Sequence, residues 1–220
     1  MPYHFSPSSL SLLKECPRCF WLHFNKKIRR PSGIFPSLPG GMDKILKEHF
    51  DRFMEKGKMP PELKGVEKGT VLFDDKTLLA VWRNNRRGIH FTDKEGNIVH
   101  GAIDSMLKKG KKMIILDFKT RGYPLKEDTA GFYKDQLDLY NLMFRKKDFM
   151  TEDYSYLLFY YPKEVSENGD VIFDTELVKM KVDIKNAEDI IKKALKVLKS
   201  EMPKPSEDCE YCKWADICRI

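Results

Sequence analysis

Apolar positions recur along the chain with two different spacings, which predict helices in some segments and strands in others. An apolar residue at every third or fourth position is typical of an amphipathic helix, and this spacing follows the N-capping residue Ser6 and continues to about Cys16. The same spacing predicts later helices over residues 42–54, 129–145 and 187–202. A stretch rich in Pro and Gly, residues 32–41, predicts a loop between the first two helices.

Short apolar runs predict the strands, and a hairpin is the clearest of them. One strand is expected over residues 98–107 and a second over 112–120, with a Gly-containing turn between them. Further strands are expected within the segment 71–91, which contains the run 77–82, and over 154–161 and 171–182. This order of elements predicts an α/β fold, with helices flanking a mixed central sheet, as one domain over residues 1–220.

Composition and charge limit the classes of protein to which this chain could belong. Hydrophobic residues make up 41% of the 220-residue chain, enough for a core, but no apolar run approaches the ~20 residues of a membrane-spanning helix. The N-terminus lacks the basic-then-apolar order of a signal peptide, so we expect a cytoplasmic protein without a membrane partner. Lys and Arg number 40 against 33 Asp and Glu, and the net charge of +7 favours a polyanionic partner such as nucleic acid.

Three charged residues of the predicted hairpin are expected to share one face of the sheet. Side chains alternate along a strand, so Asp117 and Lys119 face the same side, and antiparallel pairing brings Asp104 directly or diagonally across from Asp117. Two carboxylates so close imply a divalent cation such as Mg²⁺ or Mn²⁺, to which the Phe118 carbonyl could add a ligand. Such a site suits phosphodiester hydrolysis. The alternative is an ordinary solvated ion-pair cluster on a hairpin.

The next predicted helix adds two polar residues that complete a recognisable order of motifs. Gln136 and Tyr140, four residues apart, lie on one helical face, from which both could reach a phosphate or Lys119. The sequence Gly101-Ala102-Ile103-Asp104, then Leu116-Asp117-Phe118-Lys119-Thr120, then 136–140, resembles three successive motifs of the PD-(D/E)XK nuclease superfamily. The similar branch contains RecB-type nuclease domains, AddB and the CRISPR-adaptation exonucleases.

The resemblance implies a fold, an activity and a set of site residues. It implies a restriction-endonuclease-like fold and a metal-dependent exonuclease acting on single-stranded DNA in repair, recombination or defence, with a helicase or a CRISPR-adaptation protein as the candidate protein partner. Asp104 and Asp117 would hold the metal, Lys119 would assist the attacking water, and Gln136 and Tyr140 would position substrate and lysine. A histidine on an earlier helix completes the metal site in this branch, and His49 is the candidate, although Gly41 precedes it by eight residues rather than a few.

Four of the five cysteines form two Cys-x2-Cys pairs, one near each end of the chain. Thiolates two residues apart can bind one metal, so spacing alone permits a zinc site of Cys16, Cys19, Cys209 and Cys212. The resemblance instead implies a [4Fe-4S] cluster held by Cys16, Cys209, Cys212 and Cys218, which leaves Cys19 spare. With either set of ligands, the metal would join residues 1–30 to 203–220.

Two functions of other classes stay open at the level of sequence. The first is a nucleic-acid-binding subunit whose terminal segments are joined by a bound metal and which is active only with a partner. The second is a zinc-stapled regulatory protein without DNA chemistry.

Overall fold

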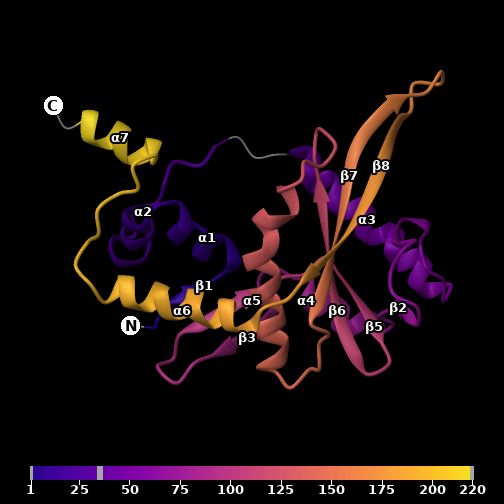
Figure 1. Ribbon diagram of the computed structural model, residues 1–220, viewed down its shortest axis with the longest axis horizontal. Coiled ribbons are helices and arrows are strands. Elements are labelled where there is room, and N and C mark those ends of the chain that lie inside the picture. The colour runs from indigo at the N-terminus through magenta and orange to yellow at the C-terminus, as the bar shows by residue number, and fades with distance from the viewer. Residues whose placement is uncertain (1, 34–36, 219–220) are drawn as a thin grey trace.

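The fold is organised around a five-stranded mixed sheet, seen in the computed structural model, which describes residues 2–33 and 37–218 (Figure 1). The strand order is β2-β5-β6-β7-β8, and all neighbours pair antiparallel except β6 and β7, which are parallel. The strands are β2 (Thr70–Leu72), β5 (Ser105–Lys109), β6 (Lys112–Thr120), β7 (Tyr154–Val165) and β8 (Val171–Lys181). The predicted α/β fold with a mixed sheet is therefore confirmed.

A second, smaller sheet lies beside the first and contains the chain's first strand. Its strand order is β1-β4-β3, with β1 parallel and β3 antiparallel to the central strand. These strands are β1 (His4–Phe5), β3 (Ile89–Thr92) and β4 (Ile98–Gly101). The N-terminal segment is thereby tied to the middle of the chain.

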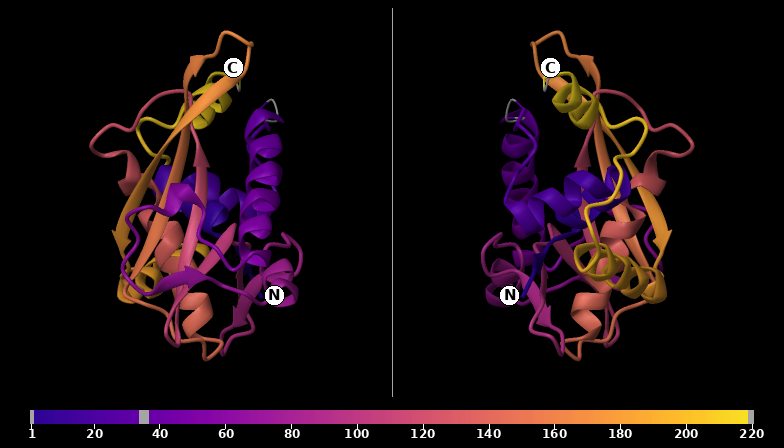
Figure 2. Two further views of the ribbon diagram at one scale, coloured as in Figure 1. Left: turned by 90° about the vertical axis from the view of Figure 1, so that its right-hand side faces the viewer. Right: turned by 90° about the vertical axis from the view of Figure 1, so that its left-hand side faces the viewer.

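Helices cover both faces of the five-stranded sheet. Helix α3 (Ser37–Glu55) packs on one face through Leu46 and Phe50, whereas α5 (Lys134–Arg145) lies on the other (Figures 1 and 2). The remaining helices are α1 (Pro7–Glu15), α2 (Pro17–Trp21), η1 (Leu22–Lys26), η2 (Pro61–Leu63), α4 (Lys76–Trp82), η3 (Thr129–Tyr133), α6 (Ile184–Leu198) and α7 (Glu210–Ile217). Among these helices of the described ranges, none is long and apolar enough to cross a lipid bilayer.

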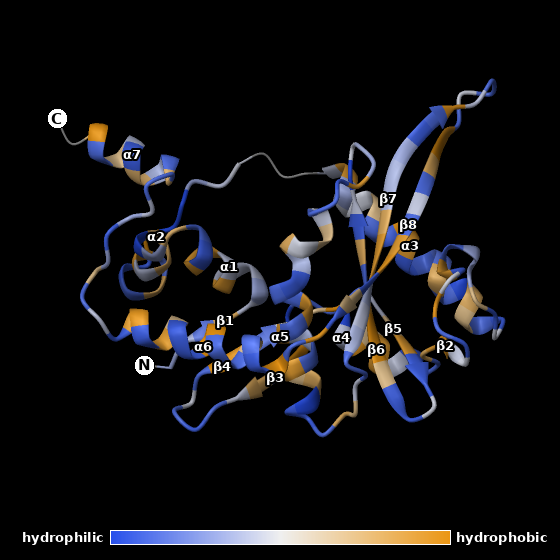
Figure 3. Ribbon diagram, in the orientation of Figure 1, coloured by the Kyte–Doolittle hydropathy of each residue, from blue (hydrophilic) through white to orange (hydrophobic). Residues whose placement is uncertain are grey.

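Helix α6 forms an outer layer over α5. Its buried residues recur at helical spacing, and Figure 3 shows the matching bands of hydrophobic and hydrophilic residues along it. Asp183 caps its N-terminus by accepting a hydrogen bond from the backbone N–H of Asn186. Because α6 leads back toward α1 and α2, it carries the C-terminal segment to the N-terminal helices (Figure 1).

Two predicted strands differ from the observed elements. Residues 77–82 belong to helix α4, capped by Asp75, because Leu79 and Trp82 bury one helical side and an apolar run alone does not distinguish helix from strand. The first hairpin strand is broken, since β4 and β5 belong to different sheets. Between them the Ile103 N–H donates to the Trp82 carbonyl, which holds the chain at the crossing.

The predicted helices are present with shifted ends. Helix α3 begins at Ser37, inside the predicted loop 32–41, of which residues 34–36 lie outside the described part of the chain. The helix predicted over 129–145 starts as the 3-10 turn η3 before α5, and α6 ends at Leu198 rather than near residue 202. Helix type was thus readable from spacing, but helix ends depend on capping and packing.

Candidate active site and cysteine cluster

The β5–β6 hairpin brings the two carboxylates together. Its register pairs Lys109 with Lys112 and Ser105 with Leu116, and one further step sets Asp104 opposite Asp117. Asp104 stands just before β5, where Oδ2 accepts a 2.8 Å hydrogen bond from the backbone N–H of Phe118. The carboxylate thus accepts a backbone hydrogen bond from β6, which holds Asp104 at the start of β5.

The surroundings of Asp104 raise the pKa of its carboxyl group. Burial, and then the neighbouring carboxylate of Asp117, raise the pKa of Asp104 to about 7, against the opposing effect of Lys47. The Lys47 ammonium lies 3.1 Å from Oδ1 of Asp104. The hydrogen bond from Phe118 favours the ionised form but does not outweigh burial. A cation beside both carboxylates would reduce the repulsion between them and favour the ionised form of Asp104.

A continuous chain of polar contacts runs from Asp117 to helix α5. Nζ of Lys119 lies 2.6 Å from Oδ2 of Asp117 and donates a 2.9 Å hydrogen bond to Oε1 of Gln136. Gln136 then donates from Nε2 to the Tyr140 hydroxyl at 2.9 Å. Burial, and then the Asp117 carboxylate, raise the pKa of Tyr140, so its phenol stays protonated.

Close packing explains why glycine stands at the end of β4. A Cβ at Gly101 would lie 2.7 Å from Cε1 of Tyr140 and 3.0 Å from Cε of Met143.

Side chains alternate between the two faces of β6. On the face toward α3, the Phe118 ring packs on Phe50 with ring centroids 4.7 Å apart. The predicted alternation along β6 is therefore realised, with Asp117 and Lys119 toward α5 and Phe118 toward α3.

Helix α3 supplies an acid and a lysine that the sequence analysis did not single out. Nζ of Lys47 bridges Oδ1 of Asp43, at 2.7 Å, and Oδ1 of Asp104, at 3.1 Å. Burial lowers the pKa of Lys47, but the two carboxylates outweigh burial and the net shift is upward, so the ammonium is retained. The signal in the sequence was a polar stripe at four-residue spacing, Asp43, Lys47 and Asp51, along one side of the helix.

The structure does not bring His49 to the carboxylates. Two residues beyond Lys47, His49 is turned by about 200° around the helix axis. Its Nε2 lies 2.9 Å from Oε1 of Glu62, and its ring contacts Phe53 with centroids 5.0 Å apart. His49 therefore faces the segment around η2, whereas Lys47 of α3 reaches Asp104 and links Asp43 to it.

The residues around Asp117 fit a divalent cation. Oδ2 of Asp117 is buried and accepts no hydrogen bond from the described residues, because the nearby Lys119 ammonium does not approach it with hydrogen-bonding geometry. The carboxylate of Asp104 is close by, Asp43 is linked to Asp104 through the Lys47 ammonium, and carboxylate oxygens are the ligands that Mg²⁺ and Mn²⁺ prefer. An unsatisfied buried oxygen among acids is the environment that such an ion would stabilise.

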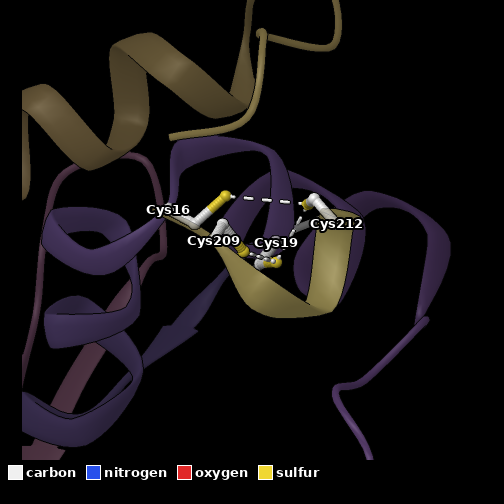
Figure 4. A group of neighbouring side chains, drawn as sticks. All are labelled: Cys16, Cys19, Cys209 and Cys212. Carbon is white, nitrogen blue, oxygen red and sulfur yellow. Dashed lines mark hydrogen bonds between the residues drawn. The ribbon is translucent and has the colours of Figure 1, made fainter. Parts of the chain in front are cut away.

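The four paired cysteines form a second site at the opposite end of the molecule from β2 and β5 (Figure 1). One sulfur atom from each of Cys16, Cys19, Cys209 and Cys212 lies within 4.8 Å of the others, and all four residues are buried. Figure 4 shows the side chains of the α2 segment and of α7 pointing toward one another. The N- and C-terminal segments are therefore joined here, and the cysteines could bind a metal ion or cluster.

The observed group of cysteines departs from the ligand set that the resemblance implied for a [4Fe-4S] cluster. Cys19, expected to be spare, lies in the group, whereas Cys218 is exposed and outside it. The physical reason is the position of Cys218 at the C-terminal end of α7, while Cys209 and Cys212 occupy its first turn. In this arrangement Cys19, rather than Cys218, is close enough to share a metal ion or cluster with Cys16, Cys209 and Cys212.

Comparison with known proteins gives a family match over nearly the whole chain. A model of the PD-(D/E)XK nuclease superfamily matches residues 4–219. No curated protein matches the sequence. Among solved structures, a crystal structure of SSO0001 is similar at 15% sequence identity with a TM-score of 0.48, over 99% of this chain and 86% of that chain, which is too weak a similarity to support an argument.

Proposed function

This chain belongs to the PD-(D/E)XK nuclease superfamily, and on that premise we propose that it is a divalent-metal-dependent DNA nuclease acting as an exonuclease on single-stranded DNA. The observation that carries the proposal is the pair of carboxylates, Asp104 and Asp117, beside the ammonium of Lys119. Acidic oxygens next to a fixed positive charge suit the hydrolysis of a phosphodiester.

In the proposed mechanism, Asp104 and Asp117 would hold Mg²⁺ or Mn²⁺, and the Phe118 carbonyl could be a further ligand. The bound ion would polarise the phosphodiester and lower the pKa of a coordinated water molecule. Lys119 orients the attacking water and stabilises the charge that develops on the phosphoryl oxygens. The hydrogen bond from Lys119 to Gln136 supports this role because it fixes the ammonium near the carboxylates.

Gln136 and Tyr140 position Lys119 and the substrate. Gln136 uses its carbonyl for Lys119 and its amide for Tyr140, so its orientation is determined on both sides. The Tyr140 hydroxyl accepts that hydrogen bond, and its own hydrogen is left to donate to a phosphate oxygen.

In this proposal Asp43, linked to Asp104 through Lys47, would be an additional protein ligand of the metal in place of His49. We expect Asp43→Asn to weaken divalent-metal binding and to slow cleavage by about tenfold or more, since a carboxylate near the ion is lost. The matched variant His49→Gln should cleave near the wild-type rate, because His49 contacts Glu62 instead of the acids. The cleavage rate of each variant is measured as a function of metal concentration. A larger defect in His49→Gln than in Asp43→Asn would show that the histidine, and not Asp43, is the ligand.

The direct test is cleavage of end-labelled single- and double-stranded DNA by the wild-type protein with Mg²⁺, Mn²⁺ or EDTA. The proposal predicts metal-dependent shortening of the single strand from an end, and resistance of a circular single strand. Cleavage of the circular strand, which has no ends, would show that the protein is an endonuclease instead.

One observation favours the partner-dependent alternative. The Lys47 ammonium pairs with Asp104, so a cation that binds Asp104 must displace this contact or share it. A protein that binds DNA without cleaving it, although its metal sites are filled, would support a subunit that needs a partner to become active.

A further inference from the structure

The sulfur atoms of the cysteine group have the spacing of ligands around a single ion. Sγ–Sγ distances are 3.9 Å between Cys16 and Cys212, 3.5 Å between Cys19 and Cys209, and 3.6 Å between Cys19 and Cys212. Four thiolates at ~2.3 Å from one zinc ion, at the corners of a tetrahedron, are separated by about 3.8 Å. The observed distances lie on both sides of this value.

A four-iron cluster needs a wider arrangement. Each of its cysteine thiolates binds a different iron atom at a corner of the cubane, so the sulfur atoms stand farther apart than around one ion. All four sulfurs here fall within 4.8 Å of one another, which leaves no room for a cubane between them. Disulfides are also excluded as the cause of the clustering, because the cysteines are free and their sulfurs are well beyond the ~2.05 Å of an S–S bond.

The surroundings suit a tetrathiolate that carries negative charge. Four thiolates and one Zn²⁺ leave two negative charges, and Arg30 donates from Nη2 toward Sγ of Cys209 at 3.7 Å. The Arg30 guanidinium also stacks over the Tyr211 ring, 4.6 Å from its centroid, which holds it beside α7. A second residue, Arg18, lies 3.6 Å from Asp216 and bonds the Pro203 carbonyl, so it anchors the same helix from α2.

We propose that Cys16, Cys19, Cys209 and Cys212 bind one zinc ion in a tetrahedral site, in place of a [4Fe-4S] cluster. Zinc suits the donors, because it accepts soft thiolates, has no redox chemistry and binds more tightly than ferrous iron to a given site. All four coordination positions are occupied by protein, so the ion is structural and fastens the segment after α1 to the start of α7. The proposal rests on the sulfur geometry and on the charge and chemistry of the thiols, and is independent of the proposed nuclease activity.

The test is the metal content of the full-length chain without an affinity tag, expressed with both iron and zinc supplied and purified anaerobically. We expect a colourless protein with one zinc per chain and little iron. Replacing zinc by Co²⁺ should give the visible absorption of a tetrahedral cobalt thiolate. Cys19→Ser should lose most of the zinc, and the matched variant Cys218→Ser should keep all of it.

Three results with bound metal would overturn the proposal. They are a brown protein with four irons per chain, a red protein with a single iron, and a protein whose Cys218→Ser variant loses metal while Cys19→Ser retains it. If Cys19→Ser does not fold, the wild-type metal content and the Cys218→Ser variant still decide the question. A well-folded wild-type protein without any metal would equally refute the zinc site.

Discussion

Lys119→Ala protein is expected to fold and bind divalent metal, yet to cleave DNA at least about 10²-fold more slowly than wild type. Nζ of Lys119 lies 2.6 Å from Oδ2 of Asp117 and is held by Gln136, so the substitution removes the fixed positive charge nearest the proposed metal. The carboxylates stay in place because the hairpin and the Phe118 hydrogen bond to Asp104 hold them. Single-turnover cleavage of labelled single-stranded DNA measures the loss.

A second lysine of the same strand provides the control. Lys112 lies at the start of β6, where its half-exposed side chain pairs with Glu152 at 3.3 Å, away from the carboxylates. Lys112→Ala should therefore cleave at the wild-type rate and reveal any general effect of losing charge from β6. Equal cleavage rates for wild type and Lys119→Ala would show that Lys119 has no role in cleavage. The zinc proposal would not be affected.

The largest expected effect on stability comes from Asp138 on α5. Its side chain is fully buried and accepts hydrogen bonds from Lys134 Nζ, from the backbone N–H of Asp183 and from Asn186 Nδ2. Asp138→Ala leaves these donors without their shared acceptor, so we expect the free energy of unfolding to fall by about 3 kcal/mol. Urea denaturation followed by circular dichroism measures this change.

The neighbouring acid Asp135 serves as the comparison. It accepts hydrogen bonds from Lys14 and Asn186 but is about one third exposed, so water replaces its contacts. Asp135→Ala should lower the free energy of unfolding by less than about 1 kcal/mol. Losses of similar size in the two variants would show that burial of the Asp138 carboxylate is not what joins α5 to α6.

Local pattern determined the parts of the fold that depend on neighbouring residues. The two-residue period of 112–120 fixed which side chains share a face, and the short turn before it fixed the register that sets Asp104 opposite Asp117. Helical spacing likewise gave α5, with Gln136 and Tyr140 on one side. These features follow from covalent geometry and short-range pairing, which are the same in any surrounding structure.

Only the tertiary structure decided the features that depend on distant segments. The run 77–82 became a helix because Leu79 and Trp82 pack into the core, and packing overrides a local preference for strand. The direction in which α3 faces the sheet turned Lys47, with its partner Asp43, toward Asp104 and turned His49 toward Glu62. The meeting of α2 with α7 placed Cys19, rather than Cys218, among the clustered thiols. The sequence by itself therefore determined which residue types were present and their spacing along each element, whereas the packing of elements decided which side chains meet, since that depends on the angle and rotation of one element against another.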